Sequence, residues 1–216
     1  NGAHMSLRSK PNDEIPWIPF EDRKRARDQK RLAVLRMAVK MFLEQGYNRT
    51  SLDDVATRLN ITKPALYNYF SGKEDILYEC YSLGSEMYEA RIDAIEKQEG
   101  NGLRKLRELI RAYVGVITQD FSMCVVRLDD RELGDQQRAE VRAAKRRFDA
   151  AFRKQIARGI EDGSIVPCDP KVTTFIITGA LNGIGNWYLP DGDLSVDEIA
   201  DAFVERLTEG LIAKPA

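Results

Sequence analysis

Two groups of residues near the start of the chain combine charge, polar tips and small side chains in a way that suits contact with nucleic acid. The first is the basic run RKRAR from Arg23 to Arg27, followed by Lys30 and Arg31. The second is the segment TKPALYNY from Thr62 to Tyr69, in which Ala65 permits a close approach. Cations pair with phosphates, and small or polar side chains can read base edges. Together the two groups predict binding to DNA.

Residues for most catalytic chemistry are missing. The single histidine, His4, lies in NGAHM, which resembles an expression-tag remnant ahead of a native start at Met5. The cysteines, Cys80, Cys124 and Cys168, stand far apart without a CxxC pair. These features argue against Ser-His-Asp or Cys-His catalysis, zinc binding and a disulfide framework. With no glycine-rich phosphate loop either, we expect no catalytic residues, no metal site, no cofactor and no enzyme activity.

The net charge of −1 hides an asymmetry along the 216 residues. Up to Gly72 there are 13 basic and 8 acidic residues, whereas the remainder has 20 basic and 26 acidic residues. A basic end on an acidic chain is typical of a protein in which one segment binds nucleic acid. No apolar run approaches the roughly 20 residues that span a bilayer, and we expect a cytoplasmic protein without a membrane partner.

The elements that must position these residues are helices. Leu35, Ala38, Val39 and Phe42 recur with the spacing of a helix face, and similar stripes follow to the end of the chain. Strand-like alternation bounded by turn residues is absent. The pattern predicts an all-α chain with about nine helices.

Three short helices are expected between Asp22 and Phe70. The first ends at Gly46, and the second runs from Ser51, which forms a capping box with Asp54, to about residue 60. The third opens at Thr62 and runs from residue 63 to about residue 69, with a proline in its first turn. Two small helices joined by a tight turn predict a helix-turn-helix.

Four segments in this region resemble the TetR-type repressors. They are AVKMFLEQGY at 38–47, TSLDDVA at 50–56, ITKPALYNYF at 61–70 and KEDIL at 73–77. The resemblance implies a ligand-responsive repressor that binds a palindromic operator as a homodimer and is released by a small apolar effector. It implies a helix-turn-helix domain at 21–72 and a ligand-binding and dimerisation domain at 73–216. From their own composition, with three prolines, residues 1–20 are expected to be a tag remnant and flexible tail.

The implied sites follow from these motifs and from the helical stripes. The resemblance implies DNA contacts at Thr50, Thr62, Lys63, Pro64, Ala65, Tyr67, Tyr69 and Lys73, and the residue types add Arg25, Arg27 and Asn68. It also implies a dimer seam formed by 172–188 and 196–211, with Phe175, Gly179, Gly183, Phe203 and Leu207 at the interface.

An effector pocket needs an apolar lining with a few polar groups. Candidates on facing stripes are Tyr88, Tyr113, Phe121, Met123, Phe148, Phe152 and Trp187, with Arg127, Asn182 and Asn186 as the polar groups. The same aromatics could equally form a solid core. Segments 121–133, 141–160 and 187–190 resemble relatives that sense acyl-coenzyme A thioesters, so an acyl-coenzyme A or an aromatic or fatty acid is one expected effector.

Two alternatives share the first seventy residues. One is a DNA-binding protein that responds to no effector, and the other is a transcriptional activator. A thermal shift on ligand binding would separate the first alternative from a ligand-responsive repressor.

Overall fold

The computed structural model describes residues 20–127 and 130–212, so the expected tag remnant and most of the tail lie outside the described residues. Nine α-helices and one short 3-10 helix follow one another in this order: α1 (Phe20–Gln45), α2 (Leu52–Arg58), α3 (Lys63–Tyr67), α4 (Lys73–Glu96), α5 (Gly102–Ile117), α6 (Asp120–Arg127), η1 (Asp130–Glu132), α7 (Asp135–Glu161), α8 (Pro170–Trp187) and α9 (Val196–Glu209). The prediction of an all-α chain with about nine helices is confirmed for this part of the chain.

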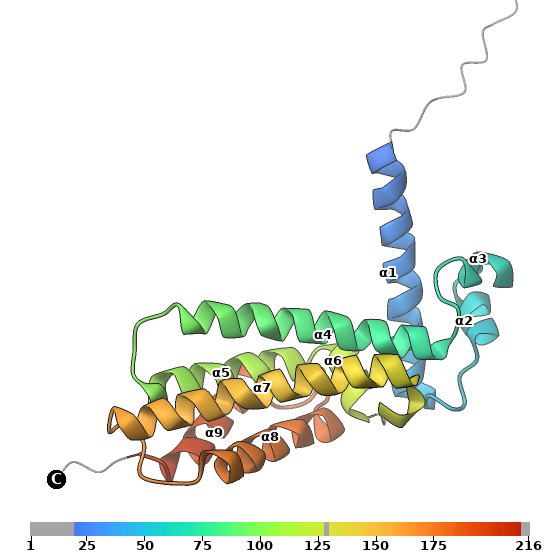
Figure 1. Cartoon of the computed structure of the whole chain (residues 1–216). Coiled ribbons are helices and arrows are strands. Elements are labelled where there is room, and N and C mark those ends of the chain that lie inside the picture. Colours follow the sequence, from blue (N-terminus) through green and yellow to red (C-terminus); the bar gives the residue numbers. More distant parts are fainter. Residues whose placement is uncertain (1–19, 128–129, 213–216) are drawn as a thin grey trace, which may run out of the picture.

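The helices form an elongated body with a smaller head at one end (Figure 1). Helix α1 stands crosswise to α4, with α2 and α3 beside it, and its first half extends beyond the body. Helices α4 and α7 run along the body, and α8 lies on the side away from α4. Helix α6 sits where head and body meet and packs against α1, α4 and α8.

Local capping explains where the short helices of the head begin. Ser51 accepts a hydrogen bond from the backbone N–H of Asp54, and the Asp54 carboxylate accepts one in return from the Ser51 N–H. Thr62 caps α3 in a similar way. Helix α3 ends at Tyr67, two residues earlier than the sequence indicates, because the chain turns there to bury Phe70. Capped helix starts satisfy backbone donors that would otherwise have no partner.

Two hydrophobic cores hold the molecule together, and α4 contributes to both. Ile76 and Cys80 belong to the core of the head, and Tyr88 and Ile95 belong to the core of the body. The head core also takes in Cys124 of α6, together with Leu133 and Val141. The head is therefore packed onto α6 and the start of α7. Because protein cores are closely packed, a shift of either helix displaces residues of the head.

Among the described residues, no single helix is long and apolar enough to cross a membrane. Helices α5 and α6 would meet the length and composition test only as a pair, and they are bent by 89° at the break between them.

Candidate functional site

Helix α3 exposes most of its side chains. Only Leu66 is fully buried, where it anchors the helix in the head core. The side chains of Lys63, Pro64 and Asn68 are exposed, and 44 % of Tyr67 is accessible to solvent. A helix that keeps one anchor and exposes the rest of its surface is suited to lie in a DNA groove.

The Lys63 ammonium is engaged in the free protein. Its Nζ lies 2.8 Å from Oδ2 of Asp53 on α2, and it lies 5.9 Å from the centre of the Tyr67 ring. The hydrogen bond to Asp53 raises the pKa of Lys63. Lys63 therefore carries its positive charge at the surface. Any phosphate that binds Lys63 must compete with the Asp53 carboxylate for its ammonium.

Two residues of the implied DNA-contact set turn inward instead. Thr50 is buried, and its hydroxyl donates to the carbonyl oxygen of Gly46 at 3.0 Å. Tyr69 is half-buried, and its carbonyl oxygen accepts a hydrogen bond of 2.8 Å from Arg31. These groups hold the turns before α2 and after α3. The Thr50 side chain is therefore not part of the surface, whereas Tyr69 stays partly exposed.

Lys73, at the start of α4, holds the head together. Its Nζ donates a hydrogen bond of 2.9 Å to the carbonyl oxygen of Tyr47 and lies 4.4 Å from the centre of the Tyr47 ring. Burial of the phenol raises the pKa of Tyr47 to about 12. The remaining N–H groups of a lysine ammonium can still meet a phosphate.

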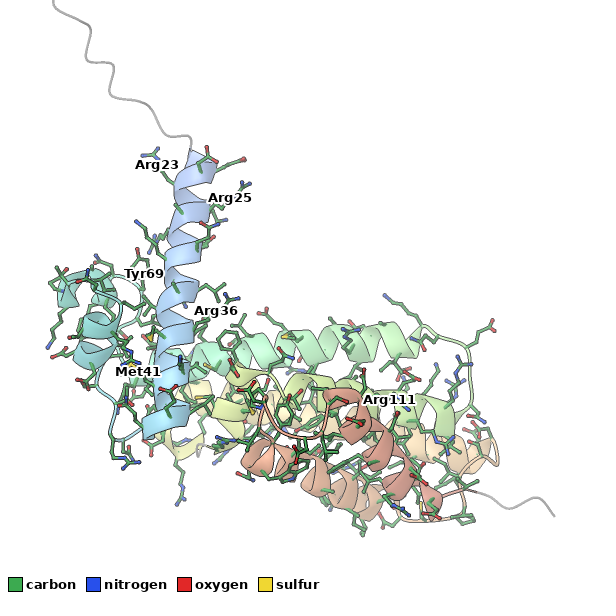
Figure 2. All side chains as sticks on the ribbon, turned by 180° about the vertical axis from the view of Figure 1, so that it is seen from behind. Arg23, Arg25, Arg36, Met41, Tyr69 and Arg111 are labelled. Atoms are coloured by element: carbon green, nitrogen blue, oxygen red, sulfur yellow. The ribbon has the colours of Figure 1, made fainter. Side chains whose placement is uncertain are left out.

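The basic run at the start of α1 divides into two parts. Arg25 and Arg27 are exposed, and Figure 2 shows Arg23 and Arg25 at the end of α1 that lies away from the body. Arg31 instead braces the head: it pairs with Glu79 at 2.7 Å, and its guanidinium lies 4.4 Å from the centre of the Phe70 ring. The first part can reach a phosphate backbone, whereas Arg31 is already engaged in the fold.

A cavity of about 380 Å³ lies in the body, with walls formed by α4, α5, α6, α7 and α8. Its fully buried end is lined by Cys80 and Tyr88 of α4, Ile117 of α5 and Ser122 of α6. Its exposed rim is formed by Lys145 of α7 and by Phe175 and Asn182 of α8. The volume lies within the usual range for small-molecule sites.

Aromatic rings define one wall of this cavity. The Tyr88 ring meets the rings of Tyr113 and Phe148 edge-on, with centroids 5.1 Å and 4.9 Å apart. The Tyr113 hydroxyl donates to Oδ1 of Asn182 at 2.5 Å, which joins α5 to α8 at the rim. Edge-to-face packing is a favourable arrangement of aromatic rings, and it holds these three rings together in the wall.

Several acidic groups of the cavity lining are shifted towards their neutral forms. A hydrogen bond with the Cys124 thiol, together with burial, raises the pKa of Cys80. Burial also raises the pKa of Tyr88 and of the Asp149 carboxyl. Lys145 is exposed at the rim, with its ammonium 5.4 Å from the centre of the Tyr81 ring.

The ten residues expected to bind an effector separate into two groups. Four of them line the cavity: Tyr88, Tyr113, Phe148 and Asn182. The other six lie off its lining: Phe121, Met123, Arg127, Phe152, Asn186 and Trp187.

Five of these six have contacts elsewhere in the fold, and the sixth, Asn186, is exposed on α8. Phe152 and Met123 are buried in the body core, and Phe121 packs on the head core. Arg127 instead donates to the carbonyl oxygen of Gly185 at 2.7 Å. Trp187 is half-exposed and stacks on Phe203, with ring centroids 6.5 Å apart.

Sequence reasoning also missed several lining residues, although their spacing carries a signal. Tyr81, Ser85 and Tyr88 follow one another at helical spacing on α4 and all line the cavity. Lys145 and Asp149 stand one turn apart on α7 and flank Phe148. A search for polar residues on the same stripes as the aromatics would have found them.

An apolar stripe runs along the exposed face of α8. Val172, Phe175 and Ile176 are each at least half exposed. Further along this helix, a Cβ added to Gly179 or Gly183 would meet no atom within 4 Å. These glycines are therefore not required by packing inside the protomer, and they leave room for another helix to approach. Phe203 and Leu207 of α9, also expected at an interface, are partly buried against the body core.

Comparison with sequence families accounts for both parts of the chain. Residues 34–80 match the family described as bacterial regulatory proteins of the tetR family. Residues 99–211 match the family described as the tetracyclin repressor-like C-terminal domain, and this match covers more than half of the chain.

Individual relatives agree along almost their whole length. The HTH-type transcriptional regulator YhgD of Bacillus subtilis, itself uncharacterised, is 29 % identical over 193 residues, which cover 86 % of this chain and 98 % of YhgD. The structure of the TetR-family regulator PfmR from Thermus thermophilus aligns with a TM-score of 0.76 at 27 % identity, covering 82 % of this chain and 97 % of PfmR. A structure of AibR in complex with isovaleryl coenzyme A and operator DNA has a TM-score of 0.71 at 24 % identity, covers 82 % and 96 % of the two chains, and shares the fold.

Proposed function

Because this chain belongs to the TetR family of bacterial transcriptional regulators, we propose that it is a repressor that binds a palindromic operator as a homodimer and is released by a small effector. The observation that carries the effector response is the cavity between α4 and α6. These two helices line the cavity and also contribute to the core of the head. A ligand that shifts either helix therefore moves the head that holds α3.

The DNA-binding surface consists of the exposed side of α3 and the start of α1. The part that enters the groove consists of Thr62, Lys63, Pro64, Ala65, Tyr67 and Asn68. Arg25 and Arg27 reach phosphates beside it, and Lys73 contributes an N–H at the start of α4. The head, at residues 21–72, is the DNA-binding domain, and the remainder is the sensor and dimerisation domain.

The dimer forms through α8 and α9. The exposed apolar stripe from Val172 to Ile176 supports this arrangement, and so does the open space at Gly179 and Gly183. A two-fold dimer presents two α3 helices to half-sites about 34 Å apart. When an effector changes the separation of the heads, the dimer loses part of its DNA contacts. Operator binding is weakened as a result.

The effector is a small and mainly apolar acid or its coenzyme A thioester. The aromatic wall of the cavity suits an acyl or aromatic body, and Lys145 at the rim suits a carboxylate or a phosphate. The isovaleryl coenzyme A bound by AibR, which has the same fold, makes short acyl thioesters the first compounds to test.

One experiment tests the function in two steps. A thermal-shift screen of fatty acids, aromatic acids and acyl-coenzyme A thioesters is followed by operator titration, with a fragment from upstream of its own gene, in the presence of each hit. A coupling free energy of about 1–3 kcal/mol would weaken operator binding roughly 5–150-fold. A ligand that raises the melting temperature but leaves operator affinity unchanged would contradict the proposal, and a ligand that strengthens operator binding would favour a different mode of control.

A further inference from the structure

One polar group at the buried end of the cavity is unpaired. Ser122 of α6 is buried, and its Oγ has no hydrogen-bond partner among the residues that the structure describes. Its side chain nevertheless lines the cavity. A buried hydroxyl without a partner loses its hydration without compensation, so such groups are rare in folded proteins and are often found at functional positions.

The wall opposite Ser122 packs closely against its hydroxyl, whose oxygen has almost no exposed surface. Gly84 of α4 faces it, and a Cβ at this position would lie 2.9 Å from Ser122 Oγ. Any side chain larger than hydrogen would press on the hydroxyl and compete with a ligand for its place. Glycine is therefore the residue that leaves the most room for a ligand oxygen beside this hydroxyl.

Two tyrosine hydroxyls of the cavity lining already have partners. The Tyr88 hydroxyl donates to the carbonyl oxygen of Leu109 at 3.3 Å, and the Tyr113 hydroxyl donates to Asn182. Apolar residues of the lining include Ile117 of α5 and Val125 and Val126 of α6. A ligand that fills this space meets the unpaired hydroxyl of Ser122 at the buried part of the wall, and the Lys145 ammonium and the Asp149 carboxyl on α7.

We propose that the effector is an oxygenated organic acid, with a hydroxyl or keto oxygen at its inner end that hydrogen-bonds to Ser122. Its carboxylate, or the thioester made from it, lies toward Lys145, and its apolar body packs against Tyr88 and Phe148. This inference rests on the proposed function, because it names the chemistry of the effector for the same cavity. It predicts that plain hydrocarbon acids bind more weakly than their oxygenated counterparts.

Matched ligand pairs test this chemistry in the full-length protein. Suitable pairs are octanoate with 8-hydroxyoctanoate, and 3-phenylpropanoate with 3-(4-hydroxyphenyl)propanoate. In calorimetric titrations we expect the wild type to bind the oxygenated member of at least one pair about tenfold more tightly or better, because a site with an unpaired polar group discriminates against a ligand that leaves it unpaired. Ser122→Ala removes the partner, and the preference should disappear or reverse.

Two further variants give the test its controls. Ser85→Ala removes another hydroxyl of the cavity lining and should keep the preference. Gly84→Ala places a methyl group against Ser122 Oγ and should abolish the preference even if Ser122→Ala fails to fold.

The outcomes separate this inference from the proposed function. Equal binding of both members of every pair by the wild type overturns the inference but leaves an effector-responsive repressor. An unchanged preference in Ser122→Ala that folds normally overturns it as well. If no member of any pair and no acyl thioester binds the wild type, the effector response itself fails and the inference falls with it.

Discussion

Lys63 of α3 and Asp53 of α2 form an ion pair across the turn of the helix-turn-helix, with Nζ and Oδ2 2.8 Å apart. Both side chains are more than half exposed, so the pair lies on the surface that we propose to face DNA. The carboxylate engages the lysine and also repels phosphates. We infer that Asp53 limits how tightly the free head binds any duplex.

Substitutions of this pair should therefore act in opposite directions on DNA affinity. Lys63→Ala should weaken operator binding and reduce the dependence of log affinity on log salt by about one unit, because one phosphate contact is lost. Asp53→Asn should strengthen binding at low salt. Fluorescence anisotropy at several salt concentrations measures both effects, and equal affinities for the two variants and the wild type would contradict this reading. Neither change should alter the melting temperature, since exposed ion pairs contribute little to stability.

Lys73→Ala should reduce stability as well as DNA binding. Its hydrogen bond to the Tyr47 carbonyl joins the start of α4 to the turn after α1, and hydrogen bonds to charged groups are typically worth about 1.5–3 kcal/mol. We expect a lower melting temperature and weaker binding to operator and unrelated duplexes alike. Tyr67→Ala is the matched contrast. It removes an exposed ring, so the melting temperature should stay unchanged and only operator binding should fall. If Lys73→Ala has the stability of the wild type, the bond to Tyr47 does not brace the head.

A bulky side chain at Gly183 should separate the protomers without unfolding them. A Cβ there meets no atom within 4 Å of its own chain, so Gly183→Trp should fold with nearly wild-type stability. We expect a monomer in sedimentation velocity at micromolar concentration, together with a loss of operator affinity, because a single head contacts only one half-site. Ala90→Trp, at an exposed position of α4, is the control that should remain a dimer. A wild-type monomer under the same conditions would refute the interface.

The head of this protein is largely predictable from its sequence because its signals are local. Ser51 and Asp54 form the expected capping box, and Thr62 caps α3 as the sequence indicates. Each depends on residues within one helical turn. The inward orientation of Thr50 does not, because its hydroxyl also lies 3.3 Å from the carbonyl oxygen of Met41, nine residues away on α1.

The cavity is less predictable because helical periodicity does not distinguish a cavity wall from a packed core. Phe148 and Phe152 lie one turn apart on the same face of α7, yet Phe148 lines the cavity and Phe152 is fully buried in the core. The difference depends on what α4, α5 and α8 place opposite each ring. Ser122 shows the same limit, since only its surroundings reveal that its hydroxyl is unpaired.

Asp149→Asn should stabilise the protein at neutral pH. Burial raises the pKa of this carboxyl above its ordinary value of 3.8, so the folded state binds a proton more readily than the unfolded state. The contribution of Asp149 to stability is therefore lost as pH rises from about 3.8 through the raised pKa of the folded protein. Thermal melts should show a higher melting temperature for the variant at pH 7 and convergence with the wild type below pH 3.8. A variant less stable than the wild type at pH 7 would show that the Asp149 charge is compensated, with Arg153 as the nearest candidate.

Arg127 should transmit the effector signal without touching the effector. It is the last residue of α6 and lies off the cavity lining, and its guanidinium donates to the carbonyl oxygens of Gly185 at 2.7 Å and Tyr188 at 3.4 Å. It thus ties α6, which lines the cavity and packs against α1, to the end of α8, which carries the proposed dimer surface. Arg127→Met keeps much of the side-chain volume but removes these donors. We expect an unchanged ligand-induced shift in melting temperature, with operator release reduced from the roughly 5–150-fold of a coupled regulator to about threefold or less.

Arg107→Met is the matched control, because Arg107 also bridges two helices, through Thr208 of α9, and should leave the coupling intact. Normal operator release by Arg127→Met would exclude this route, and loss of the thermal shift would instead place Arg127 in the effector site.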